Sequence, residues 1–182
     1  MKERSRSGWI LINAVGYQAV WFACALGAAR GQLAMALLAL PVFTAITIAY
    51  GGKARADVRC LLLVLPVGWA LDSVMLASGV LGYATPWPLA NVAPAWIGAI
   101  WAAFALTLNH SLAFLAGRAG ITAVLGAVGG PLAYLAAARL GAVQFELPLP
   151  WALLALSAAW ATALPLIVSL NQHVLARRPL PV

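Results

Sequence analysis

The chain is divided into six apolar runs of about 20 residues, separated by short stretches that contain glycine, proline or charge. A helix rises about 1.5 Å per residue, so about 20 residues cross the roughly 30 Å hydrocarbon core of a bilayer. The runs cover Trp9–Ala29, Gln32–Tyr50, Cys60–Gly82, Ala95–Ala116, Ala119–Ala138 and Leu149–Leu170. This pattern predicts an all-α integral membrane fold, a bundle of six transmembrane helices within a single domain over residues 1–182.

The composition excludes an ordinary water-soluble domain. Such a domain carries charge on about a quarter of its residues. Here only 8% of the 182 residues are charged and 64% are apolar. The net charge of +7 does not indicate a nucleic-acid partner, because the basic residues form no stripe with interleaved polar residues. We expect membrane lipids as partners, with a homo-oligomer or a partner membrane protein as further possibilities, and no nucleic acid.

The basic residues predict the orientation of the bundle. One side of the predicted topology receives Lys2, Arg4, Arg6, Lys53, Arg55, Arg59, Arg118, Arg177 and Arg178. The other side receives only Arg30 and Arg139. Lys and Arg accumulate on the cytoplasmic side of membrane proteins, so both termini are expected in the cytoplasm.

The first run admits a second interpretation. Its basic start and the small-residue segment ACALGAA, residues 23–29, also resemble a secretory signal with its cleavage site. Cleavage would leave five spans with the same orientation. We favour retention, because Asn13, Gly16, Tyr17 and Gln18 interrupt the run, whereas the apolar region of a signal is usually purer and shorter.

Asp72 is a carboxylate inside the third run. It lies twelve residues after Cys60, where this helix is expected to leave the cytoplasmic side, so its expected depth is about 18 Å, near the midplane. An aspartate at the centre of a spanning helix costs roughly 2.5 to 3.5 kcal/mol on insertion scales. We therefore expect partners that offset this penalty.

The fifth run contains Gly129, Gly130 and Pro131 at about the same depth as Asp72. A proline inside a helix removes the hydrogen bond to the carbonyl four residues earlier, here that of Ala127, and displaces that carbonyl. The sequence therefore predicts a helix that is kinked or broken at Gly129-Gly130-Pro131. A break would begin a half-helix whose free amides and positive dipole end point toward the carboxylate.

The fourth run offers polar groups to these two helices. His110 lies eight residues before Arg118, at an expected depth of about 12 Å, and is a candidate donor for the freed carbonyl. Consecutive helices joined by short loops tend to be neighbours. We therefore predict a polar binding pocket between the third, fourth and fifth helices. Its expected residues are Asp72, Asn109, His110, Gly129, Gly130, Pro131 and Tyr134.

A structural role is the alternative for these residues. Intramembrane Asp and His side chains can hold helices together through hydrogen bonds without binding anything. Gly126 and Gly130 form a GxxxG pattern, which more often marks close helix packing than a site.

Three segments resemble a known family. They are WFACALGAA (21–29), IWAAFALTLNHSLAFLAGR (100–118) and LGAVGGPLAYLAAARLGAV (125–143), with the signatures W..F..TLNHSL and GGPLAYLA..RLGA. They look like an uncharacterised family of short bacterial multi-pass inner-membrane proteins that is classified as a domain of unknown function. The resemblance implies a protein of the bacterial inner membrane. It also implies frequent association of the family with genes of fatty-acid and cyclopropane-lipid modification. The family usually has an acidic residue in the third helix, which Asp72 matches. It implies no catalytic residue.

Three functions remain open from the sequence. The first is a membrane-embedded binding or transport module that uses the midplane pocket. The second is an accessory subunit of a lipid-modification pathway, which uses the loop GGKARADVR (51–59) and the tail LARRPLPV (175–182) as contact surfaces. The third is a lipid-acting membrane enzyme, the least favoured, because the sequence has no clustered His ligands and no paired acidic motif for metal chemistry. We expect no cofactor and no metal.

Overall fold

The computed structural model describes the backbone of residues 3–176 and, within it, the side chains of residues 7–36 and 38–173. Lys2, Arg177 and Arg178, which contribute to the predicted orientation, lie outside the described residues. The described chain forms six α-helices, one short 3-10 helix and two short strands. In order they are α1 (Glu3–Ala29), α2 (Ala34–Tyr50), α3 (Ala54–Ala77), β1 (Leu81–Tyr83), α4 (Ala95–Leu108), η1 (Ala113–Leu115), α5 (Ala119–Arg139), β2 (Val143–Phe145) and α6 (Leu149–Ala176).

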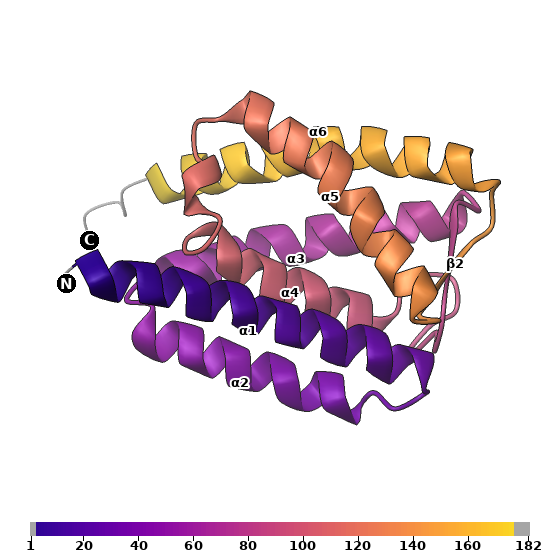
Figure 1. The fold of residues 1–182 in the computed structure, drawn as a ribbon, viewed down its shortest axis with the longest axis horizontal. Helices are drawn as coiled ribbons and strands as arrows, with labels where there is room; N and C mark the ends of the chain where they lie inside the picture. Colours follow the sequence, from indigo (N-terminus) through magenta and orange to yellow (C-terminus); the bar gives the residue numbers. More distant parts are fainter. Residues whose placement is uncertain (1–2, 177–182) are drawn as a thin grey trace, which may run out of the picture.

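The helices alternate in direction (Figure 1). The start of α1, the turn between α2 and α3, the connection from α4 to α5 and the end of α6 lie at one end of the bundle, which we call the N-end. The turn between α1 and α2 and both strands lie at the other end, which we call the sheet end. Lys53 and Arg118 therefore lie at the N-end, and Arg30 and Arg139 at the sheet end.

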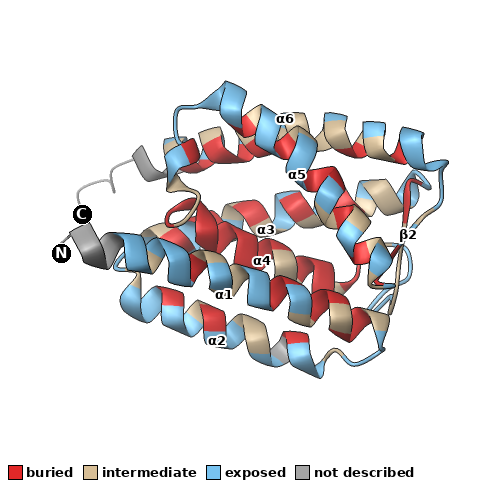
Figure 2. Ribbon diagram, viewed as in Figure 1, coloured by how far each residue is buried: buried red, intermediate tan, exposed pale blue. Residues whose placement is uncertain are grey.

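Four helices are long and apolar enough to cross a membrane. They are Ser7–Ala29 of α1, Ala54–Ala77, Ala119–Arg139 and Leu149–His173 of α6. The faces that these helices turn outward are apolar: Leu11, Leu62, Val124 and Leu154 are each at least 59% exposed. Figure 2 shows exposed residues along the outer faces of the whole bundle. Exposed leucine and valine over entire helices fit a lipid environment and do not fit water.

α4 is the central helix of the bundle, and most of its residues are buried. It ends at Leu108, so the prediction of a fourth span that continues to Ala116 is wrong. The polar residues that follow end the helix, because their hydrogen bonds leave it: the backbone N–H and the hydroxyl of Ser111 both donate to Asn13 Oδ1, at 3.2 and 2.7 Å. The chain then forms a turn and η1 before α5 begins.

The third run also ends earlier than predicted. α3 ends at Ala77, and the following residues form β1, which pairs antiparallel with β2 in a register that places Gly82 opposite Gln144. Two further bonds extend the pairing, from Glu146 N to Val80 O (3.2 Å) and from Ala84 N to Ala142 O (2.9 Å). The α3–α4 and α5–α6 connections are thereby joined at the sheet end.

α5 is one continuous helix with Pro131 inside it, so the predicted break into two half-helices is wrong, and a kink at Gly129-Gly130-Pro131 stays a prediction. The carbonyl of Ala127, which proline leaves without its usual donor, accepts a hydrogen bond from the Ser157 hydroxyl of α6 at 2.8 Å. The prediction that His110 supplies this donor is therefore wrong. The GxxxG pattern packs closely on α6, because a Cβ on Gly126 would collide with the Trp160 carbonyl and one on Gly130 with the Trp160 side chain.

Candidate functional site

The residues predicted to form one pocket lie in two separate clusters. Asp72 and Tyr134 are hydrogen-bonded to each other, whereas Asn109 and His110 bond to Asp57. Asp57 and Asp72 both lie on α3, fifteen residues and thus about 22 Å apart along the axis. The prediction that His110 and Asn109 share a site with Asp72 is therefore wrong.

Asp72 is buried, with 1% of its surface exposed, and accepts hydrogen bonds from three neutral donors. The hydroxyls of Tyr83 and Tyr134 both donate to Oδ1 at 2.6 Å, and the Trp101 indole N–H donates to Oδ2 at 2.6 Å. These donors come from β1, α5 and α4, so one carboxylate on α3 is bonded to three other elements. A carboxylate offers about four acceptor positions, which leaves one unused on Oδ2.

Local packing fixes this geometry. Trp101 lies against Gly68 of α3, where a Cβ would overlap its indole ring. Its other side stacks on Trp160 with centroids 4.9 Å apart and planes 8° from parallel. The pKa of Tyr83 is raised mainly by burial of its hydroxyl and, to a smaller extent, by the nearby Asp72 carboxylate. Tyr83 lies in β1, outside the helices. Its hydroxyl therefore keeps the proton that it donates to Asp72.

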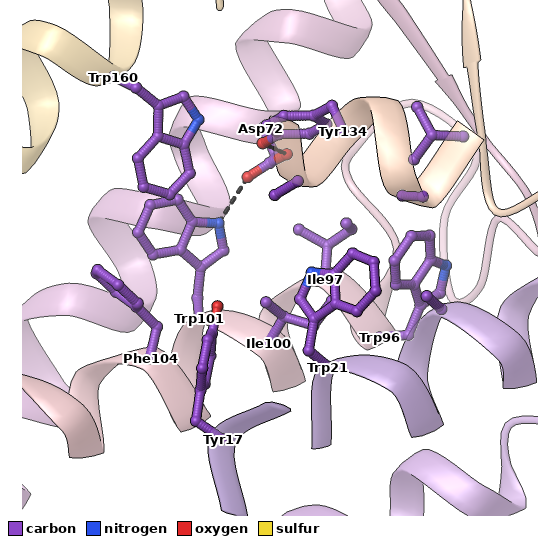
Figure 3. Close-up of a pocket in the computed structure, with 14 residues that line it drawn as sticks. Tyr17, Trp21, Asp72, Trp96, Ile97, Ile100, Trp101, Phe104, Tyr134 and Trp160 are labelled. Carbon is purple, nitrogen blue, oxygen red and sulfur yellow. Dashed lines mark hydrogen bonds between the residues drawn. The ribbon is translucent and has the colours of Figure 1, made fainter. Parts of the chain in front are cut away.

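A hollow of about 60 Å³, large enough for a few water molecules, lies beside the Asp72 carboxylate (Figure 3). Seven aromatic side chains line it, which come from α1, α4, α5 and α6. They are Tyr17, Trp21, Trp96, Trp101, Phe104, Tyr134 and Trp160. Asp72 is the charged residue among the lining residues. We call this hollow the aromatic cavity.

The aromatic cavity adjoins a larger groove of about 450 Å³ between α1 and α5. The two share Tyr17, Trp21, Phe104, Ala133 and Trp160. Gln18 and Phe22 of α1 line one wall of the groove, and Gly129, Gly130 and Leu132 of α5 line the other. A Cβ on Gly129 would meet no atom within 4 Å. The groove opens on the outer face of the bundle, because Gln18, Phe22, Gly129 and Leu132 are exposed.

Trp160 supplies an unused donor at this site. Its indole nitrogen is buried and has no hydrogen-bond acceptor among the described residues. Buried polar groups normally have a partner. Both the aromatic cavity and the groove are lined by this residue, so a ligand or a water molecule there could accept its hydrogen bond.

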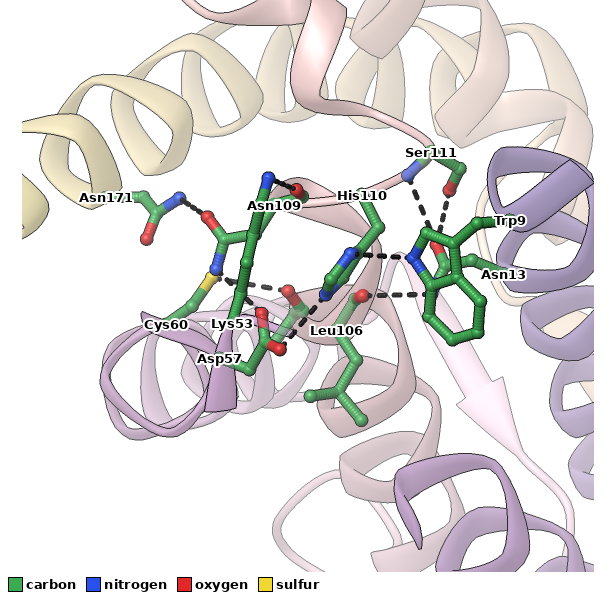
Figure 4. Close-up of polar contacts among 11 residues, drawn as sticks. Trp9, Asn13, Lys53, Asp57, Cys60, Leu106, Asn109, His110, Ser111 and Asn171 are labelled. Atoms are coloured by element: carbon green, nitrogen blue, oxygen red, sulfur yellow. Dashed lines mark hydrogen bonds and ion pairs between the residues drawn. The ribbon is translucent and has the colours of Figure 1, made fainter. Parts of the chain in front are cut away.

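The second cluster, at the N-end, is built on Asp57, which is fully buried (Figure 4). Oδ2 lies 3.0 Å from Nε2 of His110, and the side-chain amide of Asn109 donates to Oδ1 at 3.0 Å. The indole N–H of Trp9 donates to Nδ1 of His110 at 2.9 Å. Since an indole nitrogen can only donate, Nδ1 is the acceptor and Nε2 carries the hydrogen that His110 donates to Asp57.

Neighbouring polar residues complete this cluster. Asn171 of α6 donates to the side chain of Asn109 at 3.0 Å, and the Lys53 ammonium donates to the Asn109 backbone carbonyl at 2.6 Å. Asn13 of α1 donates to the Leu106 carbonyl at 3.2 Å. Four helices and the turn after α4 are therefore joined at the N-end. These contacts link the polar residues to one another and have the character of a structural joint, although Asn171 Oδ1 has no hydrogen-bond partner among the described residues.

Asp57 is not among the predicted site residues, because the sequence predicts a loop over residues 51–59. One signal could have identified it. An acidic residue in the first turn of a helix interacts favourably with the helix dipole, so a lone Asp among Lys53, Arg55 and Arg59 also fits a helix that begins near residue 54. The partners of Asp72 were missed in part as well, since Tyr83 and Trp101 lie on other elements and only the fold brings them close.

The described residues contain no group of three or more His, Cys, Asp or Glu side chains that could hold a metal ion. Cys24 and Cys60 are both buried and free. The Cys60 thiol donates to the Ala105 carbonyl at 3.3 Å.

A family model described as "Protein of unknown function (DUF2878)" matches residues 10–166. The chain belongs to the DUF2878 family. No curated protein and no solved structure matches it.

Proposed function

We propose that this DUF2878 protein is a six-span protein of the bacterial inner membrane with the N-end in the cytoplasm. The four long apolar helices and the alternation of the six helix directions support this proposal. The accumulation of basic residues at the N-end supports the orientation. α2 and α4, at 17 and 14 residues, are short for a bilayer, with lengths of about 26 and 21 Å. α4 needs no full-length apolar surface, because other helices surround it and little of it meets lipid.

We further propose that the protein is a membrane-embedded binding module whose site is the aromatic cavity. The observation that carries this proposal is a hollow lined by seven aromatic side chains and one buried carboxylate. Ligand sites are typically apolar hollows with a few well-placed polar groups. The unused Trp160 N–H and the free acceptor position on Asp72 are polar groups of this kind.

The adjoining groove suggests how a ligand enters. It opens toward the lipid-facing surface between α1 and α5, and it meets the aromatic cavity at Ala133. An amphiphile could enter sideways from the membrane, with its chain in the groove and its polar end in the cavity. A transport role would require an additional partner, because six spans offer little machinery for alternating access.

Mass spectrometry of the small molecules and lipids that co-purify with the protein tests this function. We expect Ala133→Phe, which fills the junction of cavity and groove, to reduce the retained amphiphile by about tenfold. Val128→Phe is the matched control on α5, since Val128 is 54% exposed and lines neither space. Equal retention in the wild type and both variants would overturn the proposal and leave the accessory-subunit function, for which variants at this site would be silent.

A further inference from the structure

We propose that the ligand of the aromatic cavity is an amphiphilic ammonium cation. Its nitrogen would lie between Asp72 and the aromatic faces of α1 and α4, and its alkyl chain in the groove between α1 and α5. This inference rests on the proposed binding function and adds the charge and the shape of the ligand.

The charge follows from the surroundings of Asp72. Among the described residues, the donors that contact its carboxylate are two phenols and one indole, all of them neutral. Among the described residues, the basic side chain that contacts a carboxylate is His110, and that carboxylate belongs to Asp57 in the other cluster. Three hydrogen bonds favour the anionic form of Asp72 and burial opposes it, and among the described residues no side-chain cation contacts the carboxylate to balance that charge. A cation in the cavity would supply that balance in a medium of low dielectric constant, where opposite charges attract strongly.

The aromatic lining favours an organic ammonium group over a metal ion. Ammonium cations, quaternary ones in particular, bind against the faces of Trp and Tyr rings, whereas metal ions require several oxygen, nitrogen or sulfur ligands. Beside Asp72 the cavity offers Trp21 and Tyr17 of α1 and Trp96 of α4 (Figure 3). The phenol of Tyr17 and the indole of Trp21 form no hydrogen bond to another described side chain, so their rings serve no polar network.

The dimensions of the two spaces indicate the shape of the ligand. The cavity, at about 60 Å³, has room for the charged end only. The groove is several times larger and is lined by apolar side chains such as Phe22, Leu125 and Leu132. A molecule with a compact ammonium group on an alkyl chain fits both, and the ammonium group can come from a lipid or from a free amphiphilic amine.

Native mass spectrometry from nonionic micelles can test the charge. The probe is octyltrimethylammonium, and its counterpart is octyldimethylamine N-oxide, which has the same chain and a similar head but no net charge. We expect one bound octyltrimethylammonium per protein and at least about tenfold weaker binding of the N-oxide. Equal binding of both probes, each abolished by Ala133→Phe, would overturn the cation inference and leave the amphiphile site intact. Binding of neither probe, together with equal lipid retention in Ala133→Phe, would overturn the proposed function itself.

Two pairs of variants assign the binding to this site. We expect Asp72→Asn to weaken octyltrimethylammonium binding by about tenfold, and Asp57→Asn, a matched change of a buried carboxylate on the same helix, to leave it unchanged. Trp21→Leu keeps every hydrogen bond of Asp72 and should weaken binding about fivefold, whereas Trp151→Leu, at a residue 65% exposed, should have no effect. If Asp72→Asn does not fold, the Trp21 pair and the two probes still decide the inference, and an unchanged affinity in Trp21→Leu counts against it.

Adding lipids with matched chains distinguishes the two sources of the ammonium group, a lipid headgroup and a free amphiphilic amine. Retention of phosphatidylethanolamine over phosphatidylglycerol, reduced by Trp21→Leu, would identify a lipid headgroup. Binding of octyltrimethylammonium without selective lipid retention would identify a free amphiphile. Preferential retention of phosphatidylglycerol would contradict the inference.

Discussion

The two buried carboxylates of α3 differ in what surrounds them. Asp57 at the N-end contacts an imidazole and a side-chain amide, and further amides and a lysine complete the cluster. Asp72 contacts two phenols and an indole, with an aromatic hollow next to it. Both residues are at most 1% exposed. Burial alone therefore does not distinguish a joint from a site; the chemistry of the partners does.

Replacing each carboxylate by alanine should show the largest effects. Asp72→Ala leaves three donors without an acceptor, two of them buried and one partly buried, and Asp57→Ala leaves two buried donors. We expect the free energy of unfolding, measured by SDS titration in micelles, to fall by about 3 kcal/mol and about 2 kcal/mol respectively. A larger loss of unfolding free energy in Asp57→Ala than in Asp72→Ala would indicate that the N-end cluster contributes more to stability.

Gly68→Ala should disturb the Asp72 cluster without changing a polar residue. The new Cβ would overlap the Trp101 indole, which must move away from Oδ2 of Asp72. We expect a loss of about 2 kcal/mol by the same titration, because crowding a packed interface forces such shifts. Gly129→Ala is the control, since its Cβ meets nothing within 4 Å. Equal stability of the two variants would show that Trp101 is free to move.

Trp9→Phe tests the hydrogen-bond direction in the N-end cluster. It removes the donor to Nδ1 of His110 and should lower the free energy of unfolding by about 1 kcal/mol. Nitrogen-15 NMR of labelled histidine should show the wild-type His110 with its hydrogen on Nε2. A hydrogen on Nδ1 in the wild type would contradict the bond from Trp9. Binding at the aromatic cavity should not change in this variant.

Ser157→Ala should have the smallest effect. It removes the donor to the Ala127 carbonyl and should destabilise the protein by about 0.6 kcal/mol, the usual size of such bonds between membrane helices. Thr162→Ala is the control, because the Thr162 hydroxyl is exposed and bonds only to carbonyls of its own helix. A loss above about 2 kcal/mol would mean that α5 depends on Ser157 to stay continuous at Pro131.

The sequence predicted the helices well because apolar runs of this length have few alternatives. It also identified Asp72 and Tyr134, whose polar groups are unusual in such runs. The prediction failed where two residues at a similar depth in the membrane were expected to be close in space. His110 was placed by counting residues along a helix, but α4 ends at Leu108 and His110 lies in the turn beyond it.

Partners from distant elements could not be inferred from spacing. Tyr83 reaches Asp72 because β1 returns toward α3, and a three-residue strand leaves almost no periodic signal in the sequence. The Ala127 carbonyl of α5 likewise accepts its hydrogen bond from a hydroxyl of α6, thirty residues later in the chain. Proline predicts a missing bond, but the sequence does not say which neighbour replaces it.

The pairing of β1 with β2 has a mechanical consequence. At the sheet end, the connections that follow α3 and α5 are fastened together by a ladder of backbone bonds, so α5 cannot move far from α3 there. If the groove between α1 and α5 widens, α5 must therefore pivot about the paired strands. The widening would be greatest at the opposite end of α5, next to η1. A disulfide engineered between α1 and α5 near that end should lock the entrance, while one close to the strands should leave passage unaffected.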